Sequence, residues 1–262
     1  MNLDLNNKYA LVCGSSQGIG LATAKELSLL GATVTLAARN QERLENALRE
    51  LDTSNGQQHN FIVVDFNEPL KLAQAIQQYL ANNPAFHILI NNSGGPPGGL
   101  LLNASLEEFE ITFRRHLECN HILTQNLVPG MTEYGYGRIV NIISTSVKQP
   151  LNGLGVSNTI RGAVANWAKT MANELGNRGI TVNNVLPGAT NTVRLKQIIE
   201  SKAKKLNKEI SEVENSMKSI VPAGRFAEAN EIASAIAFLS SPAAGYINGI
   251  NLPVDGGRTG SL

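Results

Sequence analysis

Two hydrophobic periods alternate along the chain. Apolar runs of strand length recur at residues 9–13, 33–37, 61–64, 87–90, 138–143, 180–186 and 250–254. The segments between them repeat their apolar positions with the period of an α-helix, over 21–30, 41–51, 70–81, 106–134, 156–175 and 229–239. Because strands and helices alternate, the pattern predicts an α/β fold in which about seven strands form a doubly wound parallel sheet with helices on both faces.

The segment 193–220 is polar and lysine-rich, although its apolar residues keep a helical spacing. We interpret it as a helical insertion over the sheet edge, which is either a mobile lid or a surface helix pair without a function of its own. No linker and no internal repeat divides the chain. We therefore expect residues 1–262 to form a single domain.

Composition narrows the classes of partner and location. The chain is 42% hydrophobic and 16% charged, with a net charge of +1. A charge so close to neutral gives no reason to expect nucleic acid or an anionic membrane as a partner. The apolar runs are too short to cross a bilayer, and the amino terminus lacks the pattern of a secretion signal. Cys13 and Cys119 form no metal or redox motif, and we expect a cytoplasmic protein without a metal site.

A glycine-rich loop directly follows the first predicted strand and precedes a helix. It reads Gly14-Ser-Ser-Gln-Gly-Ile-Gly20, with a G-x-x-x-G-x-G spacing. Gly14 would allow a sharp turn, and Gly18 and Gly20 would let a pyrophosphate approach the amino terminus of the helix. A purely structural turn would look similar. The order of strand, loop and helix favours a dinucleotide-binding, Rossmann-type unit.

The residues after the second and third strands bear on the choice of cofactor. Ala38 and Arg39 follow the second strand, where an acid would normally select a free ribose 2′-hydroxyl. Arg39 can pair with a 2′-phosphate, and Ser15 and Ser16 could donate to it, which favours NADP(H) over NAD(H). Arg39 could instead be a solvated residue at a helix start. Asp65 follows the third strand, where it could contact adenine or cap the next element.

Two further stretches should meet at the carboxyl edge of the sheet, where reacting groups collect in such folds. The segment 91–99, rich in glycine and proline, follows the fourth strand. The stretch from Ser144 to Arg161 follows the fifth strand and leads into a helix. It carries two hydroxyls, Ser144 and Ser157, and a cation that does not deprotonate at neutral pH, Arg161.

The chain resembles the short-chain dehydrogenases/reductases over nearly its whole length, and in particular members similar to 3-oxoacyl-acyl-carrier-protein reductases. The supporting stretches are CGSSQGIG (13–20), VDF (64–66), NNSG (91–94), GRIVNIIS (137–144), VNNVLPGATNT (182–192) and GRFAEANEIASAIAFLSSPAAGYINGINLPVDGG (224–257). The resemblance implies one NAD(P)-binding domain and usually a homo-oligomer, a tetramer or a dimer. It also implies a set of cofactor contacts: Gly14, Gly18, Ile19 and Gly20 at the pyrophosphate, Asp65 at the adenine, Asn91 in the cleft, and Pro187, Gly188 and Thr192 near the nicotinamide.

The resemblance also shows where this chain departs from its family. The family uses asparagine, serine, tyrosine and lysine, with the last two in a Y-x-x-x-K motif. Only the serine is kept, as Ser144, whereas Ser157 stands for the tyrosine, Arg161 for the lysine and His116 for the asparagine. Ser157 is a weak acid with a short side chain, and Arg161 can still donate to the nicotinamide ribose but cannot relay a proton. His116 could exchange a proton near neutral pH, or it could be a helix residue satisfied by local hydrogen bonds.

Two main functions remain open at this point. The first is an NADP-dependent oxidoreductase acting on a carbonyl or alcohol of a small molecule, with atypical proton delivery through Ser144, His116 and water. The second is a catalytically silent protein of the same fold that serves as a nucleotide-binding regulator or as a partner in an oligomer. A non-redox reaction with His116 as base is a third possibility. The intact cofactor motifs favour the first, but a fold does not by itself fix a function.

Overall fold

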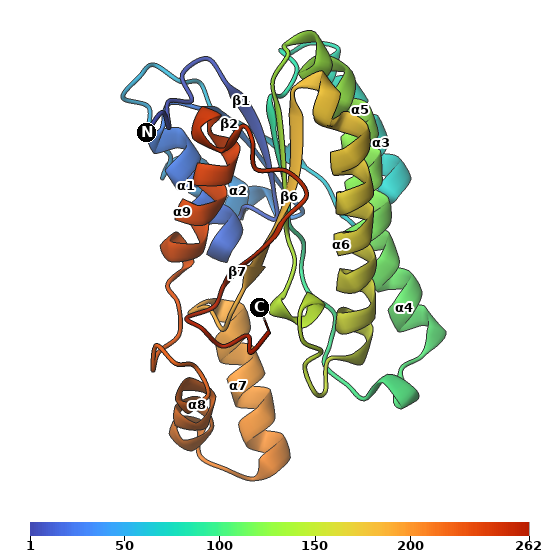
Figure 1. Ribbon diagram of the computed structural model, residues 1–262, viewed down its shortest axis with the longest axis vertical. Coiled ribbons are helices and arrows are strands. Elements are labelled where there is room, and N and C mark those ends of the chain that lie inside the picture. Colours follow the sequence, from blue (N-terminus) through green and yellow to red (C-terminus); the bar gives the residue numbers. More distant parts are fainter. Residues whose placement is uncertain (262) are drawn as a thin grey trace.

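Seven parallel strands form one sheet through the centre of the molecule (Figure 1). The computed structural model describes residues 1–261. In that range the sheet order is β3-β2-β1-β4-β5-β6-β7. The predicted doubly wound α/β architecture is therefore confirmed. The strand bounds are β1 Tyr9–Cys13, β2 Thr33–Ala38, β3 Asn60–Val63, β4 Ile88–Asn91, β5 Gly137–Ile142, β6 Ile180–Pro187 and β7 Asn251–Val254.

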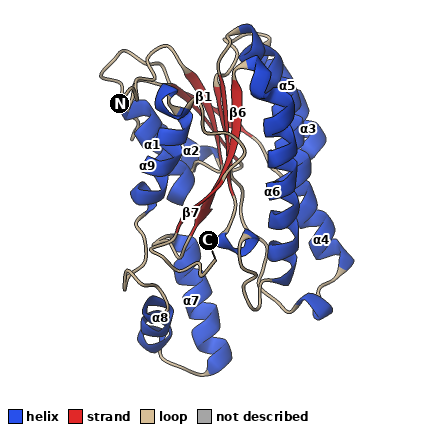
Figure 2. Ribbon diagram, viewed as in Figure 1, coloured by secondary structure: helices blue, strands red, loops and turns tan. Residues whose placement is uncertain are grey.

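Helices cover both faces of the sheet (Figure 2). One layer contains α1 (Gly18–Leu29), α2 (Gln41–Leu48) and α9 (Ala229–Ser240), and the other contains α3 (Pro69–Leu80), α4 (Leu106–Phe113), α5 (Cys119–Glu133) and α6 (Gly155–Leu175). Side chains of each strand point alternately to the two layers. Val12 and Ile90 pack toward the first layer, while Leu11 and Leu89 pack toward the second.

One correction concerns the helix predicted as continuous over 106–134. A turn of π-helix at Arg114–Glu118 separates α4 from α5 without breaking the rod. Such a turn inserts an extra residue into the helical period, and π-turns often lie at functional sites. It carries His116, whose side chain is buried with 4% of its surface exposed. The hydrophobic period alone could not show this change of hydrogen-bond pattern.

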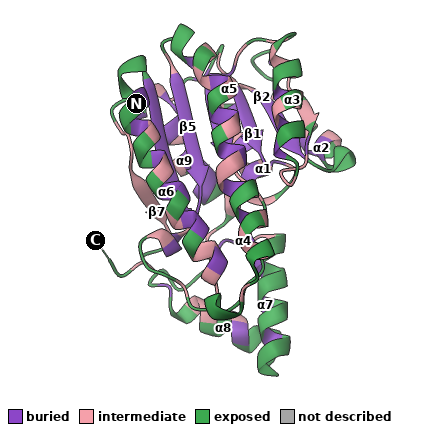
Figure 3. Ribbon diagram, turned by 90° about the vertical axis from the view of Figure 1, so that its right-hand side faces the viewer, coloured by how far each residue is buried: buried purple, intermediate pink, exposed green. Residues whose placement is uncertain are grey.

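The segment 193–220 forms two helices, α7 (Val193–Leu206) and α8 (Ile210–Ser219), which extend beyond the sheet (Figure 1). Asn207 ends α7 in the left-handed conformation, with φ of 53°. The pair has its own small core of Leu195, Ile199, Ala203, Val213 and Phe226, and most of its remaining surface is exposed (Figure 3). Within residues 1–261, no helix combines the length and apolar character needed to cross a membrane.

Candidate functional site

The candidate site lies at the carboxyl edge of the sheet, around the point where the strand order reverses. There β1 pairs on one side with β2 and on the other with β4, so the loops after β1 and β4 leave in different directions. Such a switch point opens a crevice in doubly wound sheets. The loops after β1, β4, β5 and β6 carry most of the predicted site residues.

The glycine turn after β1 has a backbone that only glycine adopts easily. Gly14 and Gly18 have φ of 58° and 60°. A Cβ on Gly20 would lie 2.3 Å from the Gly14 carbonyl oxygen, so no larger residue fits between turn and helix. The side-chain amide of Asn92 donates to that same carbonyl over 3.3 Å, which ties the loop after β4 to the turn. The N-cap residue of α1, Gln17, makes no side-chain hydrogen bond to the helix, so its first amides remain for an anion.

The two serines of the turn have different positions. Ser15 is fully buried, and its hydroxyl oxygen accepts a hydrogen bond from the Ala37 amide over 3.0 Å. This bond secures the turn against β2, and donation of the Ser15 hydroxyl proton to a phosphate stays a prediction. Ser16 is partly exposed and Arg39 is exposed at the end of β2. Ser16 and Arg39 are thus the more exposed of the three candidates for a ribose phosphate.

Asp65 shapes the loop that follows β3. Its Oδ1 accepts from both the backbone and the side-chain amide of Asn67, at 2.9 Å each. Asn67 in turn accepts from Arg115 Nε over 2.5 Å. Asp65 therefore shapes this turn and does not cap α3, whose N-cap residue is Glu68. The half-buried carboxylate keeps its second oxygen for a ligand such as an adenine amino group.

The opposite wall of the crevice is the loop between β6 and α7. Thr192 caps α7 by accepting from the Leu195 amide over 3.3 Å. A Cβ on Gly18 would meet Thr192 Cγ2 at 3.5 Å, so the glycine turn and this loop face each other closely. A Cβ on Gly188 would lie 2.7 Å from Asp255 Cα, which explains why glycine follows Pro187.

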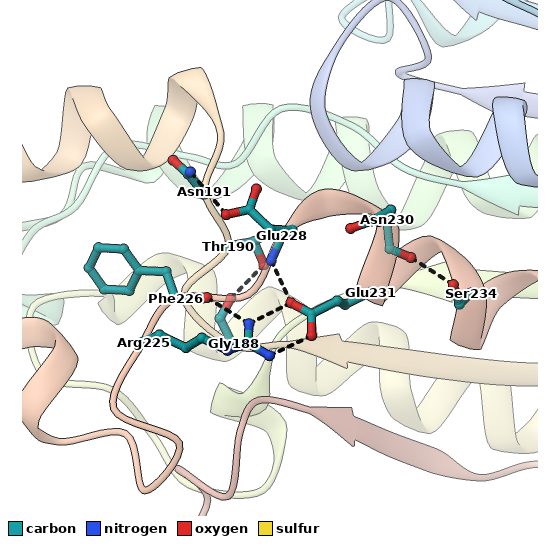
Figure 4. Close-up of polar contacts among 9 residues, drawn as sticks. All are labelled: Gly188, Thr190, Asn191, Arg225, Phe226, Glu228, Asn230, Glu231 and Ser234. Carbon is teal, nitrogen blue, oxygen red and sulfur yellow. Dashed lines mark hydrogen bonds and ion pairs between the residues drawn. The ribbon is translucent and has the colours of Figure 1, made fainter.

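The segment 225–231 holds the β6–α7 loop in place (Figure 4). Asn191 donates its side-chain amide to Glu228 over 3.2 Å, and its backbone amide donates to Ala227 over 2.7 Å. Arg225 and Glu231 form a two-bond ion pair at 2.6 and 2.7 Å beneath these contacts. The residues before and at the start of α9 therefore support the loop that carries Gly188 and Thr192.

Ser144 follows β5, and Ser157 and Arg161 lie one turn apart on α6, whose Arg161 contacts the end of β5. The hydroxyl oxygen of Ser144 accepts from the Ser146 amide over 3.1 Å, leaving its proton to donate. Ser157 is half-buried in the first turn of α6. Arg161 is buried and donates from Nη1 to the Ile142 carbonyl over 2.7 Å, which fixes the cation under the end of β5.

Arg161 is a buried charge without an acid to balance it. No ion pair within residues 1–261 includes it, and its Nε is buried without a hydrogen-bond partner. Burial lowers the pKa of Arg161 to about 10, so the guanidinium stays charged at neutral pH. A cation in this state favours a ligand with hydroxyl or anionic oxygens beside it.

His116 faces the loop after β4. Its Nδ1 lies 2.9 Å from the Ser93 hydroxyl, and its Nε2 is buried without a partner. Burial, with a smaller contribution from the Arg161 charge, holds its pKa well below the usual range, while the Gly94 backbone acts in the opposite direction. The imidazole is therefore neutral at pH 7 and a weak base. The hydrogen bond to Ser93 satisfies one ring nitrogen, and the part that His116 plays in catalysis stays a prediction.

Sequence reasoning placed Asn91 in the cleft but missed its partners. Asn91 is buried, and its amide donates to Asn141 on the next strand over 2.8 Å. Asn141 donates to Asn184, and Asn184 to Asn251, also at 2.8 Å each. Ser93 and Asn92 are further residues that were not singled out individually. In the sequence, only the NNSG motif could have drawn attention to them. The pairing of Asn91 with Asn141 could not be found in this way, because it depends on strand register.

The comparisons with known proteins agree with this geometry. Residues 14–259 match the family model described as enoyl-(acyl carrier protein) reductase. The 3-oxoacyl-[acyl-carrier-protein] reductase FabG of Pseudomonas aeruginosa is 32% identical over 260 residues, which cover 97% of this chain and 98% of that protein. The chain belongs to the short-chain dehydrogenase/reductase family. The predicted family resemblance is thus confirmed.

Other family members match over a similar length. The gluconate 5-dehydrogenase of Gluconobacter oxydans is 30% identical, over 98% of this chain and 97% of that protein. The crystal structure of L-sorbose reductase from Gluconobacter frateurii, complexed with NADPH and L-sorbose, has a TM-score of 0.93 and 29% identity, with both chains covered completely. The structure of YwfH, an NADPH-dependent reductase involved in bacilysin biosynthesis, has a TM-score of 0.91 and 27% identity, covering 97% of this chain and 99% of that one. This chain therefore matches these family members over its whole fold.

Proposed function

We propose that this protein is an NADP-dependent oxidoreductase that interconverts a carbonyl compound and an alcohol. The observation that carries the proposal is the open glycine turn at the start of α1, where Gly14 and Gly18 hold positive φ and Gly20 excludes any Cβ. A cradle of this shape fits a pyrophosphate. The family members whose structures contain or require NADPH support the same choice of cofactor.

The residues that would hold the cofactor come from the carboxyl ends of β1, β2, β3, β4 and β6, from the loops after them, and from α6. Gly14, Gly18, Ile19 and Gly20 would surround the pyrophosphate, with Ser16 and Arg39 at the ribose phosphate. Asp65 would contact the adenine, and Asn91 would lie at the floor of the cofactor cleft. The cleft wall beside the nicotinamide would consist of Pro187, Gly188 and Thr192. Arg161 would donate to the ribose hydroxyls. When bound, the nicotinamide supplies or accepts the hydride.

The oxygen of the substrate would be handled by Ser144 and Arg161. The Ser144 hydroxyl would donate to the carbonyl oxygen, because its own oxygen already accepts from Ser146. The fixed charge of Arg161 would favour negative charge that develops on that oxygen during reduction. In this scheme hydride adds to the carbonyl carbon and the oxygen takes its proton from water, since the side chain of Ser157 is short and weakly acidic.

We assign His116 a positioning role. Its buried neutral ring contacts Ser93, and its Nε2 is buried without a hydrogen-bond partner among the described residues. Asparagine at this position could still bond to Ser93 and is the conservative replacement. His116→Asn should keep kcat within about threefold, and the dependence of kcat on pH should not change. If the variant lost the rise or the fall of kcat with pH, His116 would be the group that transfers the proton.

Cofactor binding and turnover are separable tests. Calorimetry with NADPH and NADH measures binding, and absorbance of NADPH measures reduction of L-sorbose, a 3-oxoacyl thioester and a panel of ketones and aldehydes. NADP+ with gluconate tests the oxidative direction. Ser144→Ala should lower kcat by about a hundredfold if Ser144 donates to the reacting oxygen. Tight NADPH binding without turnover of any substrate would favour the silent regulator, and absence of NADPH binding would overturn both functions.

We also propose that α7 and α8 form a cover over the substrate. Arg194 at the start of α7 donates to the Pro96 carbonyl over 2.9 Å, so this helix already reaches the loop after β4. The separate small core of the pair suits movement as a unit. Arg194→Ala should raise KM for the substrate more than it lowers kcat, and an unchanged KM would contradict a covering role.

We further propose that the protein acts as a homo-oligomer, a dimer or tetramer, in the cytoplasm. Leu106 and Phe113 are exposed on α4, which supports a subunit contact along that helix layer. Light scattering after size-exclusion chromatography measures the mass. A monomer at micromolar concentration would contradict the oligomer.

A further inference from the structure

A cavity of about 470 Å³ lies at the amino-terminal edge of the sheet, at the end opposite to the candidate site. Its walls come from the first residues of β5 and β6, from the turn after α6 and from the loop between α9 and β7. The walls include the backbones of Gly135, Gly176, Gly179 and Gly245. Cavities of this volume are in the range that binds small molecules.

Arg138 brings a positive charge to this cavity. It is the second residue of β5, and only 5% of its surface is exposed. Its Nε donates to the Ser241 carbonyl over 3.3 Å, and its Nη1 donates to the carbonyls of Gly137 and Gly179 over 2.8 and 3.4 Å. The guanidinium also stacks on the Tyr136 ring at 4.1 Å. These contacts fix its position and orientation.

The charge of Arg138 is not balanced by an acid. No ion pair within residues 1–261 includes Arg138, and neither aspartate nor glutamate lines the cavity. Carbonyl dipoles and an aromatic ring lower the cost of burying a cation, but they do not neutralise it. Burial accordingly lowers the pKa of Arg138 below its usual range.

A purely structural role accounts for only part of this arrangement. The bonds from Nε and Nη1 clamp three backbone carbonyls together. The structure gives Nη2 no hydrogen bond, and a Cβ on Gly245 would lie 3.4 Å from this nitrogen, which places it at the glycine-lined wall. Thr181, paired with Arg138 in register, also lines the cavity, and its buried hydroxyl has no partner. Arg138 Nη2 is therefore an unused donor beside an open volume.

We propose that this cavity is a second binding site, for a small organic anion that carries a carboxylate or phosphate group. Arg138 Nη2 binds an anionic oxygen. The body of the ligand lies along the glycine backbones and against Tyr246, whose fully exposed ring stands at the rim. The site is independent of the proposed catalytic function, but β5 and β6 connect it physically to Ser144 and Gly188 at their other ends.

The experiment is calorimetric titration of the full chain with three probes of similar shape. Benzoate and phenyl phosphate carry the two kinds of anionic group, and benzyl alcohol is the uncharged comparison. We expect saturable binding of at least one anion and none of benzyl alcohol, and the tighter anion identifies the preferred group. Absence of saturable binding by both anions, or equal binding of benzyl alcohol, would overturn the proposal.

Variants then place the binding at this cavity. Arg138→Met should weaken anion binding about tenfold to a hundredfold, the range for a lost bond to a charged group. Because Arg138 also holds backbone carbonyls together, that variant could unfold. Tyr246→Glu changes a fully exposed side chain and therefore tests the site without disturbing the core. It should weaken binding severalfold through like-charge repulsion, and Tyr246→Lys should strengthen it. Leu70→Glu, an equally charged change at an exposed position of α3, is the control. Equal effects of Tyr246→Glu and Leu70→Glu would show binding elsewhere.

Discussion

Asn91 donates its side-chain amide to Asn141 across 2.8 Å, and this contact is the first link of a chain through four neighbouring strands. The next links run from Asn141 to Asn184 and from Asn184 to Asn251, with each amide donating in the same direction. The residues are direct register partners on β4, β5, β6 and β7. The aligned amides leave Asn91 Oδ1 as a buried acceptor at the end of the chain.

The middle of this chain should matter more to stability than its end. Asn141→Ala would leave a donor on Asn91 and an acceptor on Asn184 unpaired in the buried sheet, and it should lower the free energy of unfolding by about 2–4 kcal/mol. Asn251→Ala should cost less than about 1 kcal/mol, because Asn251 lies on the edge strand and is half-buried, where water can replace it. Urea unfolding measures both. Equal costs would mean that the chain does not act as a connected network.

Gly20 should tolerate no side chain. Gly20→Ala places a Cβ 2.3 Å from the Gly14 carbonyl oxygen, so the glycine turn must move away from the helix start. We expect at least about a tenfold loss of NADPH affinity together with a lower melting temperature. The control is Gly162→Ala in α6, where nothing lies within 4 Å of the new atom and where alanine should stabilise the helix by up to about 1 kcal/mol. Unchanged NADPH binding in Gly20→Ala would contradict the assignment of the turn to the cofactor.

The sequence predicted the sheet because strands buried on both faces read as continuous apolar runs, such as the one ending at Cys13. It also predicted the glycine turn, since positive φ and close approach leave few alternatives to glycine. It could not predict the π-turn at His116, because one extra residue barely changes the hydrophobic period. It also could not show that Ser15 bonds to β2 and Asn91 to Asn141. Those partners depend on strand register, which follows from the packing of the whole chain.

Arg39 should set the preference for NADPH. It is exposed, and no ion pair within residues 1–261 engages it, so its guanidinium is available to a ribose phosphate. Arg39→Ala should weaken NADPH binding about tenfold to a hundredfold, the range for a bond to a charged group, and should change NADH binding little. Arg49→Ala, an equal loss of charge at the far end of α2, is the control. An equal loss of affinity for NADPH and NADH in Arg39→Ala would contradict a role of Arg39 in cofactor selectivity.

Stability should fall on mild acidification because of buried histidines. The His87 ring is buried between Tyr9 and Tyr134, and its Nδ1 accepts from the Tyr9 amide over 3.1 Å, which requires the neutral form. Burial, with a smaller effect of Lys8, lowers its pKa from 6.5 to about 4. His116 is shifted in the same direction. The unfolded chain then binds more protons than the folded one below pH 6.5, so stability is constant above that pH and declines toward pH 4.

Urea unfolding at a series of pH values between 8 and 4 tests this slope. His87→Asn keeps a side-chain acceptor for the Tyr9 amide but removes the titrating ring, so it should flatten the decline below pH 6.5. Combining it with His116→Asn should flatten the decline further, because the two histidines contribute independently. Tyr134→Phe keeps the stacked ring beside His87 and should retain the full slope. If the slope persists in the double variant, the acid sensitivity does not come from these two histidines. Carboxylates, which become protonated at lower pH, would then be the groups responsible.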